Sequence, residues 1–141
     1  MNTLIKEITS QETWSIRHQV MWPDEPFDYI KLPVDDKGLH FGLWANGKLV
    51  SVVSLFIEEG IGQFRKFATL VTEQGKGYGS QLLHHLMEIA RTKNVKRIWC
   101  NARINKTAYY GKFGMQVTEE QFVKNGIEYV VMERWFNVNK L

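Results

Sequence analysis

The alternation of apolar and polar positions over residues 3–9 predicts that the chain begins with a strand. The apolar spacing then changes to that of a helix over residues 13–22. Ser10 or Thr13 could cap this helix, and Pro23 ends it. The first quarter of the chain is therefore expected to contain one strand followed by one helix.

The segment from residue 23 to residue 38 has no clear periodicity and is rich in proline and acidic residues. Its acids are Asp24, Glu25, Asp28, Asp35 and Asp36. Such a composition predicts a loop or a short helix over the surface. The acids are compatible with a cationic amine ligand, although a run of charges is usually a solvated face.

The clearest local signal is a hairpin. Two β-prone runs, residues 39–45 and 48–58, flank the pair Asn46-Gly47. Both residues of this pair tolerate positive φ, which a tight type I′ turn requires. A second turn at "EEGIG" leads into a further strand over residues 63–71.

The second half of the chain alternates between helical and strand patterns. Apolar residues at helical spacing, from Leu82 to Ala90, predict an amphipathic helix, and residues 95–102 predict a strand after it. "NKTAYYGKF" predicts a short helix, and "GMQVTEE" and "IEYVVMERW" predict two final strands. A helix between strands 63–71 and 95–102 is a right-handed crossover, so these strands should be parallel neighbours.

These elements predict an α/β (α+β) fold in which a mixed central sheet of about seven strands is flanked by three or four helices. The 141 residues contain no repeat, linker or shift in composition. Residues 1–141 are therefore expected to form a single domain with one core and one site.

Composition narrows the possible partners. The charge of +3 and pI near 9.0 permit an anionic ligand, but no stripe of Lys and Arg is interleaved with aromatics, so nucleic acid is not expected as a partner. The chain has no run of about 18 apolar residues, so no membrane span is expected. The N-terminus lacks the pattern of a signal peptide, and Cys100 has no second cysteine to pair with. We expect a cytoplasmic protein in which Cys100, within the apolar run "RIWCN", is a core residue.

Three glycines precede the amphipathic helix, in "TEQGKGYGSQLLHHL", residues 72–86. Glycines at a helix start let backbone N–H groups approach an anion, and the helix dipole adds to the attraction. Lys76 and Ser80 would add a charge and a hydroxyl. The spacing matches neither the P-loop nor the dinucleotide fingerprint. The alternative is a simple strand-to-helix turn in which one glycine takes positive φ.

The segment resembles the acetyl-CoA signature of the GNAT superfamily of N-acetyltransferases, which is Gln or Arg, two residues, Gly, one residue, then Gly or Ala. Gln74, Gly77 and Gly79 match it, and Gly75 falls at a variable position. The resemblance implies that the loop amides bind the CoA pyrophosphate. The cofactor-binding residues that it implies are Gln74, Gly75, Lys76, Gly77, Tyr78, Gly79 and Ser80, with Phe67, Ala68 and Thr69 binding the pantetheine arm through their strand backbone.

A second motif, "NARINKTAYYGKFGM", looks like the C-terminal motif of the same family, in which a Tyr stands four residues before a Gly. Tyr110 and Gly114 have this spacing. The resemblance implies direct attack of an amine on acetyl-CoA in a ternary complex, with Tyr110 as the general acid for the leaving thiolate and no metal. The alternatives are that Tyr109 is the acid, or that both rings are aromatic core. The chain looks most like small bacterial members of the ElaA-like type.

The general base is not assigned by sequence. Where some family members carry a glutamate on the strand before the glycine loop, this chain has Gln63, and an amide cannot accept the proton. Glu58 and Glu59 are near enough to substitute, but they are also typical turn acids. His40, His84 and His85 are less well placed.

The C-terminal motif departs from the family in a second way. Arg103 stands where many members have an asparagine, with Asn101 and Asn105 close by. Lys106 and Lys112 could meet the ribose phosphate of CoA, but lysines on a short helix are usually solvated.

The acceptor is expected to be a primary amine, on a small molecule or a protein. Aromatic and basic residues of the first helix and the following loop could line its pocket, or pack the helix on the sheet: Trp14, Arg17, His18, Trp22 and Tyr29. The missing glutamate leaves open a CoA-binding sensor module without catalysis. A homodimer also remains open.

Overall fold

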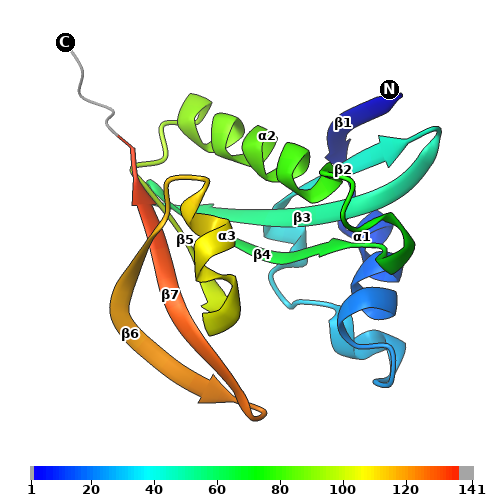
Figure 1. Cartoon of the computed structure of the whole chain (residues 1–141). Coiled ribbons are helices and arrows are strands. Elements are labelled where there is room, and N and C mark those ends of the chain that lie inside the picture. The colour runs from blue at the N-terminus through cyan, green and yellow to red at the C-terminus, as the bar shows by residue number, and fades with distance from the viewer. Residues whose placement is uncertain (1, 137–141) are drawn as a thin grey trace. The chain divides into compact units, whose positions relative to one another are not determined.

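The computed structural model describes residues 2–136, and its seven strands form one mixed sheet in the order β1-β2-β3-β4-β5-β7-β6 (Figure 1). The strands are β1 (Thr3–Ile8), β2 (Leu39–Ala45), β3 (Lys48–Glu58), β4 (Ile61–Thr69), β5 (Arg97–Arg103), β6 (Gln116–Lys124) and β7 (Ile127–Trp135). The helices are α1 (Ser10–Ile16), α2 (Tyr78–Thr92) and α3 (Thr107–Gly111), with a π-helix, η1 (Arg17–Met21), and four 3₁₀ helices, η2 (Phe27–Ile30), η3 (Asp35–Lys37), η4 (Val71–Glu73) and η5 (Ile104–Lys106). The predicted mixed α/β sheet is confirmed.

The chain divides into two compact units. The first comprises the residues up to Phe56 together with Lys66–Leu86, and the second comprises Ile57–Arg65 and the chain from Met87 onward. Strands β3 and β4 and helix α2 each contribute residues to both units.

In the first unit, α1 begins at Ser10, before either predicted cap would allow. The cap is Thr9, whose side chain accepts from the N–H of Glu12 at 3.2 Å, while Glu12 Oε1 accepts from the N–H of Thr9 at 2.9 Å. This reciprocal pair is a capping box. The prediction of Ser10 or Thr13 was wrong because Glu12, three residues after Thr9, decides the cap. The predicted helix also ends differently, since its second half widens into the π-helix η1.

The predicted hairpin forms with its predicted bounds, and all but the last two residues of β3 belong to the first unit. β2 and β3 pair antiparallel, with Ala45 opposite Lys48 across a turn in which Asn46 and Gly47 both have positive φ. β1 pairs antiparallel with the other edge of β2. A cluster of buried side chains joins α1 to these strands and to the end of β4: Ile8, Ile16, Val52 and Ala68.

In the second unit, β4 and β5 are parallel, as the crossover prediction required. Their ladder joins Ile61–Gln63 to Arg97–Trp99. β4 starts two residues before the predicted strand 63–71 and ends two residues before its end. β5 also pairs antiparallel with β7 over its whole length.

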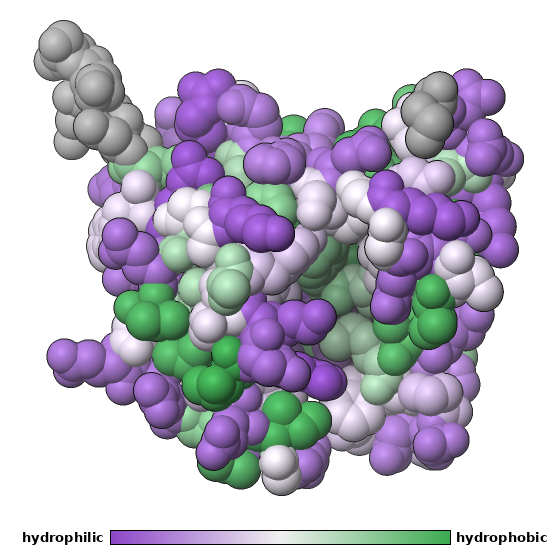
Figure 2. All heavy atoms as spheres, viewed as in Figure 1, coloured by the Kyte–Doolittle hydropathy of each residue, from purple (hydrophilic) through white to green (hydrophobic). Residues whose placement is uncertain are grey.

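β6 and β7 form a hairpin closed by Asn125 and Gly126, which both have positive φ. β6 is an edge strand of the sheet and is longer than predicted. Figure 2 shows apolar side chains interspersed with polar ones along this hairpin, where Val117 and Val123 are exposed. Buried side chains of the unit come from β4, β5, β7, the last turns of α2, the turn before β5 and the segment after α3, and they include Phe64, Met87, Ala90, Val95, Ile98, Cys100, Ala102, Phe113, Met115, Val130, Val131 and Met132.

Candidate active site

The glycine loop lies in the first unit, between η4 and α2, and two of its three glycines have a left-handed backbone. Gly75 has φ +81° and Gly77 has φ +84°, a region that other residues rarely adopt. A Cβ at either position would meet nothing within 4 Å. Both glycines are therefore needed for backbone conformation, and the alternative of a turn with a single left-handed glycine is wrong.

Gly79 is needed for a different reason. Its φ is not left-handed, but an added Cβ would lie 3.2 Å from Phe67 Cζ and 3.2 Å from Thr69 Oγ1. Such contacts are tighter than ordinary packing. Gly79 thus allows the first turn of α2 to approach the end of β4. These are the two segments to which the family resemblance assigns cofactor binding.

The side chains of the loop have partners within the protein. Gln74 donates from Nε2 to the Thr69 carbonyl at 2.9 Å, which ties the loop to the end of β4. Lys76 forms an exposed ion pair with Glu73, at 3.1 Å from Nζ to Oε1. Tyr78 is buried and anchors the helix start. The backbone N–H groups at the start of α2 are consequently the part of the loop that is suited to bind an anion.

The strand segment Phe67–Thr69 is fixed by a residue that the sequence did not single out. Ser51, on β3, is fully buried; its hydroxyl donates to the Ala68 carbonyl at 3.2 Å and lies 2.8 Å from Thr69 Oγ1. The one available signal was a polar residue inside a mostly apolar strand, and Ser51 shares it with Ser54. Lys66, just before this segment, has φ +57°, a left-handed residue inside a strand.

Tyr110 lies on α3 in the second unit, where its ring contacts Phe64 of β4 (centroids 5.8 Å apart) and Tyr109 (5.4 Å). Burial raises the pKa of the Tyr110 hydroxyl above its usual value, and the nearby Cys100 and Tyr109 act in the same direction. The phenol therefore stays protonated at neutral pH. Tyr109 also contacts Phe113 in a tilted arrangement, with centroids 5.3 Å apart.

The glycine that follows Tyr110 by four residues also has a conformational role. Gly114 has φ +83°, and Arg134 packs over it, with its Cδ 3.2 Å from the position that a Cβ would take. Arg134 donates to the Phe113 carbonyl at 3.0 Å. The Tyr-to-Gly spacing therefore coincides with the sharp exit from α3 toward β6.

Cys100 is confirmed as a core residue. It is buried on β5, and burial raises the pKa of its thiol to about 12. A thiol that stays protonated is a poor nucleophile. Cys100 therefore offers no covalent chemistry at neutral pH.

The residues considered for the acceptor pocket differ in how deeply they are buried. Arg17 is fully buried, so it supports the segment and does not line an accessible surface. Tyr29 is exposed and contacts Trp22 edge-on, with centroids 5.3 Å apart. Trp14 and His18 both contact the ring of Phe27, a residue that the sequence did not single out.

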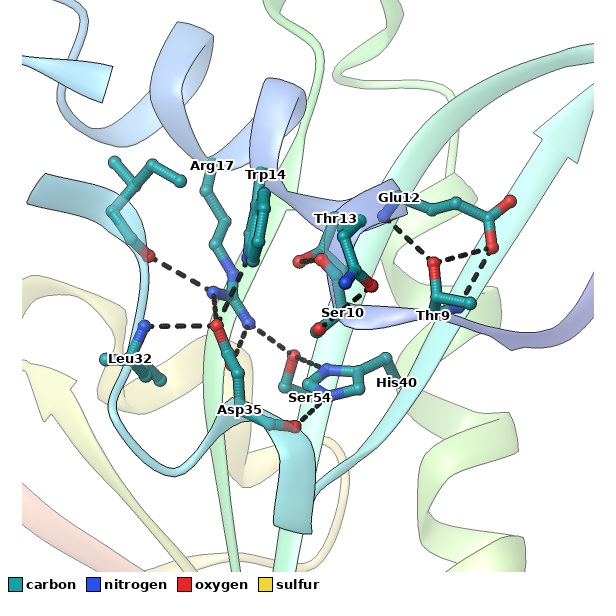
Figure 3. A network of polar contacts seen from close by, with 12 residues as sticks. Thr9, Ser10, Glu12, Thr13, Trp14, Arg17, Leu32, Asp35, His40 and Ser54 are labelled. Atoms are coloured by element: carbon teal, nitrogen blue, oxygen red, sulfur yellow. Dashed lines mark hydrogen bonds and ion pairs between the residues drawn. The ribbon is translucent and has the colours of Figure 1, made fainter. Parts of the chain in front are cut away.

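Figure 3 shows the polar network around Arg17, which the sequence did not predict. Arg17 forms a bidentate pair with Asp35, at 2.9 Å and 3.0 Å, and donates to the Ile30 carbonyl and to Ser54 Oγ. Asp35 also accepts from the indole N–H of Trp14 at 3.2 Å and from the N–H of Leu32 at 3.0 Å. The network ties the loop of residues 23–38 to η1 and β3.

His40 extends the network, and its two partners indicate which of its ring nitrogens carries the hydrogen. Its Nε2 lies 2.8 Å from the Asp35 carbonyl, and its Nδ1 lies 2.7 Å from Ser54 Oγ. Because a carbonyl only accepts, Nε2 carries the hydrogen, and Ser54 can donate to Nδ1 while it accepts from Arg17. His40 is buried with both ring nitrogens engaged, which argues against it as the general base.

Asp35 makes stability depend on pH. Burial alone would raise its pKa, but hydrogen bonds from Arg17, Leu32 and Trp14 and the charge of Arg17 outweigh burial, so its pKa lies below the ordinary value. A lowered carboxyl pKa contributes stability that is present above the unfolded value, about 3.9, and is lost as pH falls through the folded value. Urea unfolding of the wild type and Asp35→Asn should therefore show a stability difference that shrinks below about pH 4. A constant difference down to about pH 2 would contradict this expectation.

The acids considered for the base and the lysines considered for CoA contacts lie at exposed positions. Glu58 and Glu59 are exposed at the β3–β4 turn, where Glu59 has φ +53°. Gln63 is half-buried beside Trp99 in the β4–β5 ladder. Lys106 and Lys112 are both exposed at the two ends of α3.

His84 and His85 lie on α2. His84 is exposed, and the half-buried ring of His85 contacts Phe41, with centroids 5.8 Å apart. Over residues 2–136 no group of three or more His, Cys, Asp or Glu side chains is arranged to hold a metal ion. Within the same range, no helix has the length and apolar character needed to cross a membrane.

Comparison with known proteins agrees with these features. Residues 5–136 match the family model described as the acetyltransferase (GNAT) domain. An uncharacterized N-acetyltransferase of Bacillus subtilis (strain 168), YitI, is 28% identical over 146 residues, covering 96% of this chain and 98% of that protein.

Two solved structures show the same fold. Escherichia coli ElaA is 17% identical with a TM-score of 0.77, covering 94% of this chain and 99% of that one. A GNAT family acetyltransferase from Elizabethkingia anophelis with acetyl-CoA bound is 16% identical with a TM-score of 0.75, covering 96% and 99%. The family model spans nearly all of the chain, so the protein belongs to the GNAT acetyltransferase family.

Proposed function

We propose that this protein is an acetyl-CoA-dependent N-acetyltransferase, a single acyl-CoA N-acyltransferase domain over residues 1–141 that acetylates a primary amine by direct attack in a ternary complex. The observation that carries the proposal is the backbone of the glycine loop. Left-handed Gly75 and Gly77 turn the chain into the N-terminus of the 15-residue helix α2, with open space where side chains would stand. A pyrophosphate fits that combination of backbone N–H groups at a helix start and the positive end of the helix dipole.

The residues around the loop support the same ligand. The N–H groups of the segment from Gln74 to Ser80 would hold the pyrophosphate, and Lys76 would add a positive charge. The backbone of Phe67, Ala68 and Thr69 would hold the pantetheine arm. Acetyl-CoA supplies an activated thioester, which an amine can attack. The acetyl-CoA bound to the Elizabethkingia anophelis relative is consistent with this assignment.

Tyr110 is proposed as the general acid. Its phenol remains protonated at neutral pH, since burial raises its pKa, and a protonated phenol can donate to a leaving sulfur. The oxyanion that develops on the acetyl carbonyl requires fixed N–H donors, which we assign to the backbone near Phe67–Thr69. The amine must lose a proton, and no side chain is assigned to that step.

A CoA-binding sensor without catalysis is the second candidate. Gln63 favours it, because an amide stands where some family members carry the glutamate that accepts the proton. Tight binding of acetyl-CoA with no CoA release in a screen of primary amines would support the sensor. CoA release with any of these amines would support the enzyme.

Replacing Gly77 with glutamate should weaken acetyl-CoA binding at least about tenfold, or about 1.4 kcal/mol. A carboxylate would stand next to the proposed pyrophosphate and repel it, and the left-handed backbone would be strained. The matched control is Gly47→Glu in the β2–β3 turn, where φ is +81° and a Cβ also meets nothing within 4 Å. Calorimetry should give an unchanged Kd for the control, and equal Kd values for both variants would refute the assignment of the loop.

A further inference from the structure

One ammonium group of this protein already lies in an aromatic site. Lys31 Nζ is 4.5 Å from the centroid of the Trp14 ring and 5.6 Å from that of Phe27. The same nitrogen lies 2.8 Å from Asp28 Oδ1. Two ring faces and one carboxylate together are the chemistry that recognises a cation. We call Trp14, Phe27 and Asp28 the ammonium cage.

The rings of the cage are held in place from behind. The indole N–H of Trp14 donates to Asp35, which the buried Arg17 neutralises. Phe27 contacts the rings of Trp14 and His18 edge-on, with centroids 6.4 Å and 5.4 Å apart. Phe27 is nevertheless 44% exposed, so one side of the cage faces solvent.

Lys31 is held less firmly than the rings. A lysine side chain has many rotamers, and the ion pair of Lys31 is with a carboxylate that is 85% exposed. Exposed pairs of this kind contribute little to stability. Lys31 is therefore an occupant that another ammonium can replace, whereas the rings and their supports remain.

The cage is connected to the segment to which the proposed function assigns the pantetheine arm. Trp14 lies on α1, two residues before Ile16, and Ile16 packs in one buried cluster with Ala68 of β4. A ligand in the cage therefore lies on the helix that packs against that strand.

We propose that the ammonium cage binds the second, non-reacting ammonium of a linear diamine acceptor, with Lys31 as the group that it displaces. This inference rests on the proposed function. The amine that attacks an acetyl group must be neutral, whereas ring faces and a carboxylate select a charged group. The cage thus suits the amine that is not acetylated. The ammonium group bound there takes no part in the chemical step.

The experiment compares two acceptors that differ only in the second charge, 1,5-diaminopentane and 5-amino-1-pentanol. In Lys31→Gln the cage loses its occupant, so KM for the diamine should fall about fivefold relative to the wild type, while KM for the amino alcohol stays unchanged. Lys37→Gln, an exposed lysine of η3, has the same change of charge and should leave both KM values unchanged. Equal effects of Lys31→Gln and Lys37→Gln on the diamine would overturn the proposal.

Replacing an aromatic ring of the cage gives a second test, with the opposite expected effect on KM for the diamine. In the Lys31→Gln background, Phe27→Leu and Trp14→Leu should each raise KM for the diamine and leave KM for acetyl-CoA unchanged. Phe27→Leu should disturb folding less than Trp14→Leu. Trp14 donates a hydrogen bond to Asp35, whereas Phe27 has no polar side-chain group to contribute to that network. An unchanged KM for the diamine in a folded Phe27→Leu protein would also overturn the proposal.

Binding without turnover separates the cage from the proposed function. Calorimetric titration of Lys31→Gln with 1,5-diaminopentane should show binding that Phe27→Leu weakens. If neither amine is acetylated but this binding is seen, the cage stands and the acetyltransferase proposal fails for these amines. If the amino alcohol and the diamine are acetylated equally well and binding does not depend on Phe27, the cage fails and the function stands.

Discussion

Replacing Asp35 with asparagine should lower the free energy of unfolding by about 3 to 5 kcal/mol, which is the usual effect of removing one partner of a buried ion pair. The guanidinium of Arg17 is fully buried, and Asp35 is its only carboxylate partner among the contacts of the described residues. Asparagine has nearly the same shape, so the loss comes from the uncompensated charge and from weakened hydrogen bonds, and not from a cavity.

The large expected loss of stability follows from the number of hydrogen bonds that Asp35 accepts. Its carboxylate accepts from Arg17 through both oxygens, from Trp14 and from Leu32. Its carbonyl accepts from His40. The loop of residues 23–38 has little other regular structure to hold it, so loss of this carboxylate should loosen the loop before the sheet unfolds.

Urea unfolding at neutral pH gives the measurement, and two variants sharpen it. Asp36→Asn makes the same change of charge at an exposed neighbour and should cost under about 0.5 kcal/mol. Arg17→Met with Asp35→Leu removes both charges and should recover much of the stability lost in Asp35→Asn, because no charge is left unpaired. Similar stabilities for Asp35→Asn and Asp36→Asn would contradict the role of the pair.

Replacing Tyr110 with phenylalanine should lower kcat by about 10²- to 10⁴-fold, the range that general acid catalysis typically contributes. The ring would still pack on Phe64 and Tyr109, so stability should change little. The Tyr110→Phe variant would lack the hydroxyl that we propose as the proton donor to the leaving sulfur. The Kd for acetyl-CoA should remain within about threefold of the wild type, since the change affects the chemical step more than binding.

Tyr109→Phe is the matched control, because it removes the same hydroxyl one residue away. Steady-state kinetics should give a kcat for Tyr109→Phe close to that of the wild type. If Tyr109→Phe loses activity and Tyr110→Phe does not, the acid is Tyr109. If neither variant changes kcat, the leaving group needs no tyrosine and the proposed mechanism is wrong in this step.

The elements that were predicted correctly are those specified by residues close together in the sequence or by the order of the elements. Asn46-Gly47 specifies a tight turn by itself, and the bounds of β2 and β3 match the predicted 39–45 and 48–58. The parallel pairing of β4 and β5 followed from the crossover rule, which depends only on the order of elements. The residues of the glycine loop were singled out by their family signature.

The features that were missed depend on contacts between distant residues. Arg17 and Asp35 are 18 positions apart, and each lies in a segment without regular periodicity, so no spacing rule pairs them. The role of Ser51 depends on contacts of its hydroxyl with Ala68 and Thr69 on another strand, which local pattern does not indicate. The left-handed conformation of Gly75 was also hidden, because the signature leaves its position variable.

The bond from Gln74 to the Thr69 carbonyl changes how the family signature should be understood. The signature accepts glutamine or arginine at this position, and what these side chains share is an N–H group that can donate to a carbonyl. In this protein that donor is used to close the loop on its own strand. A carboxylate at position 74 has no N–H group, so it could not make this bond to the Thr69 carbonyl, even with Gly75, Gly77 and Gly79 in place.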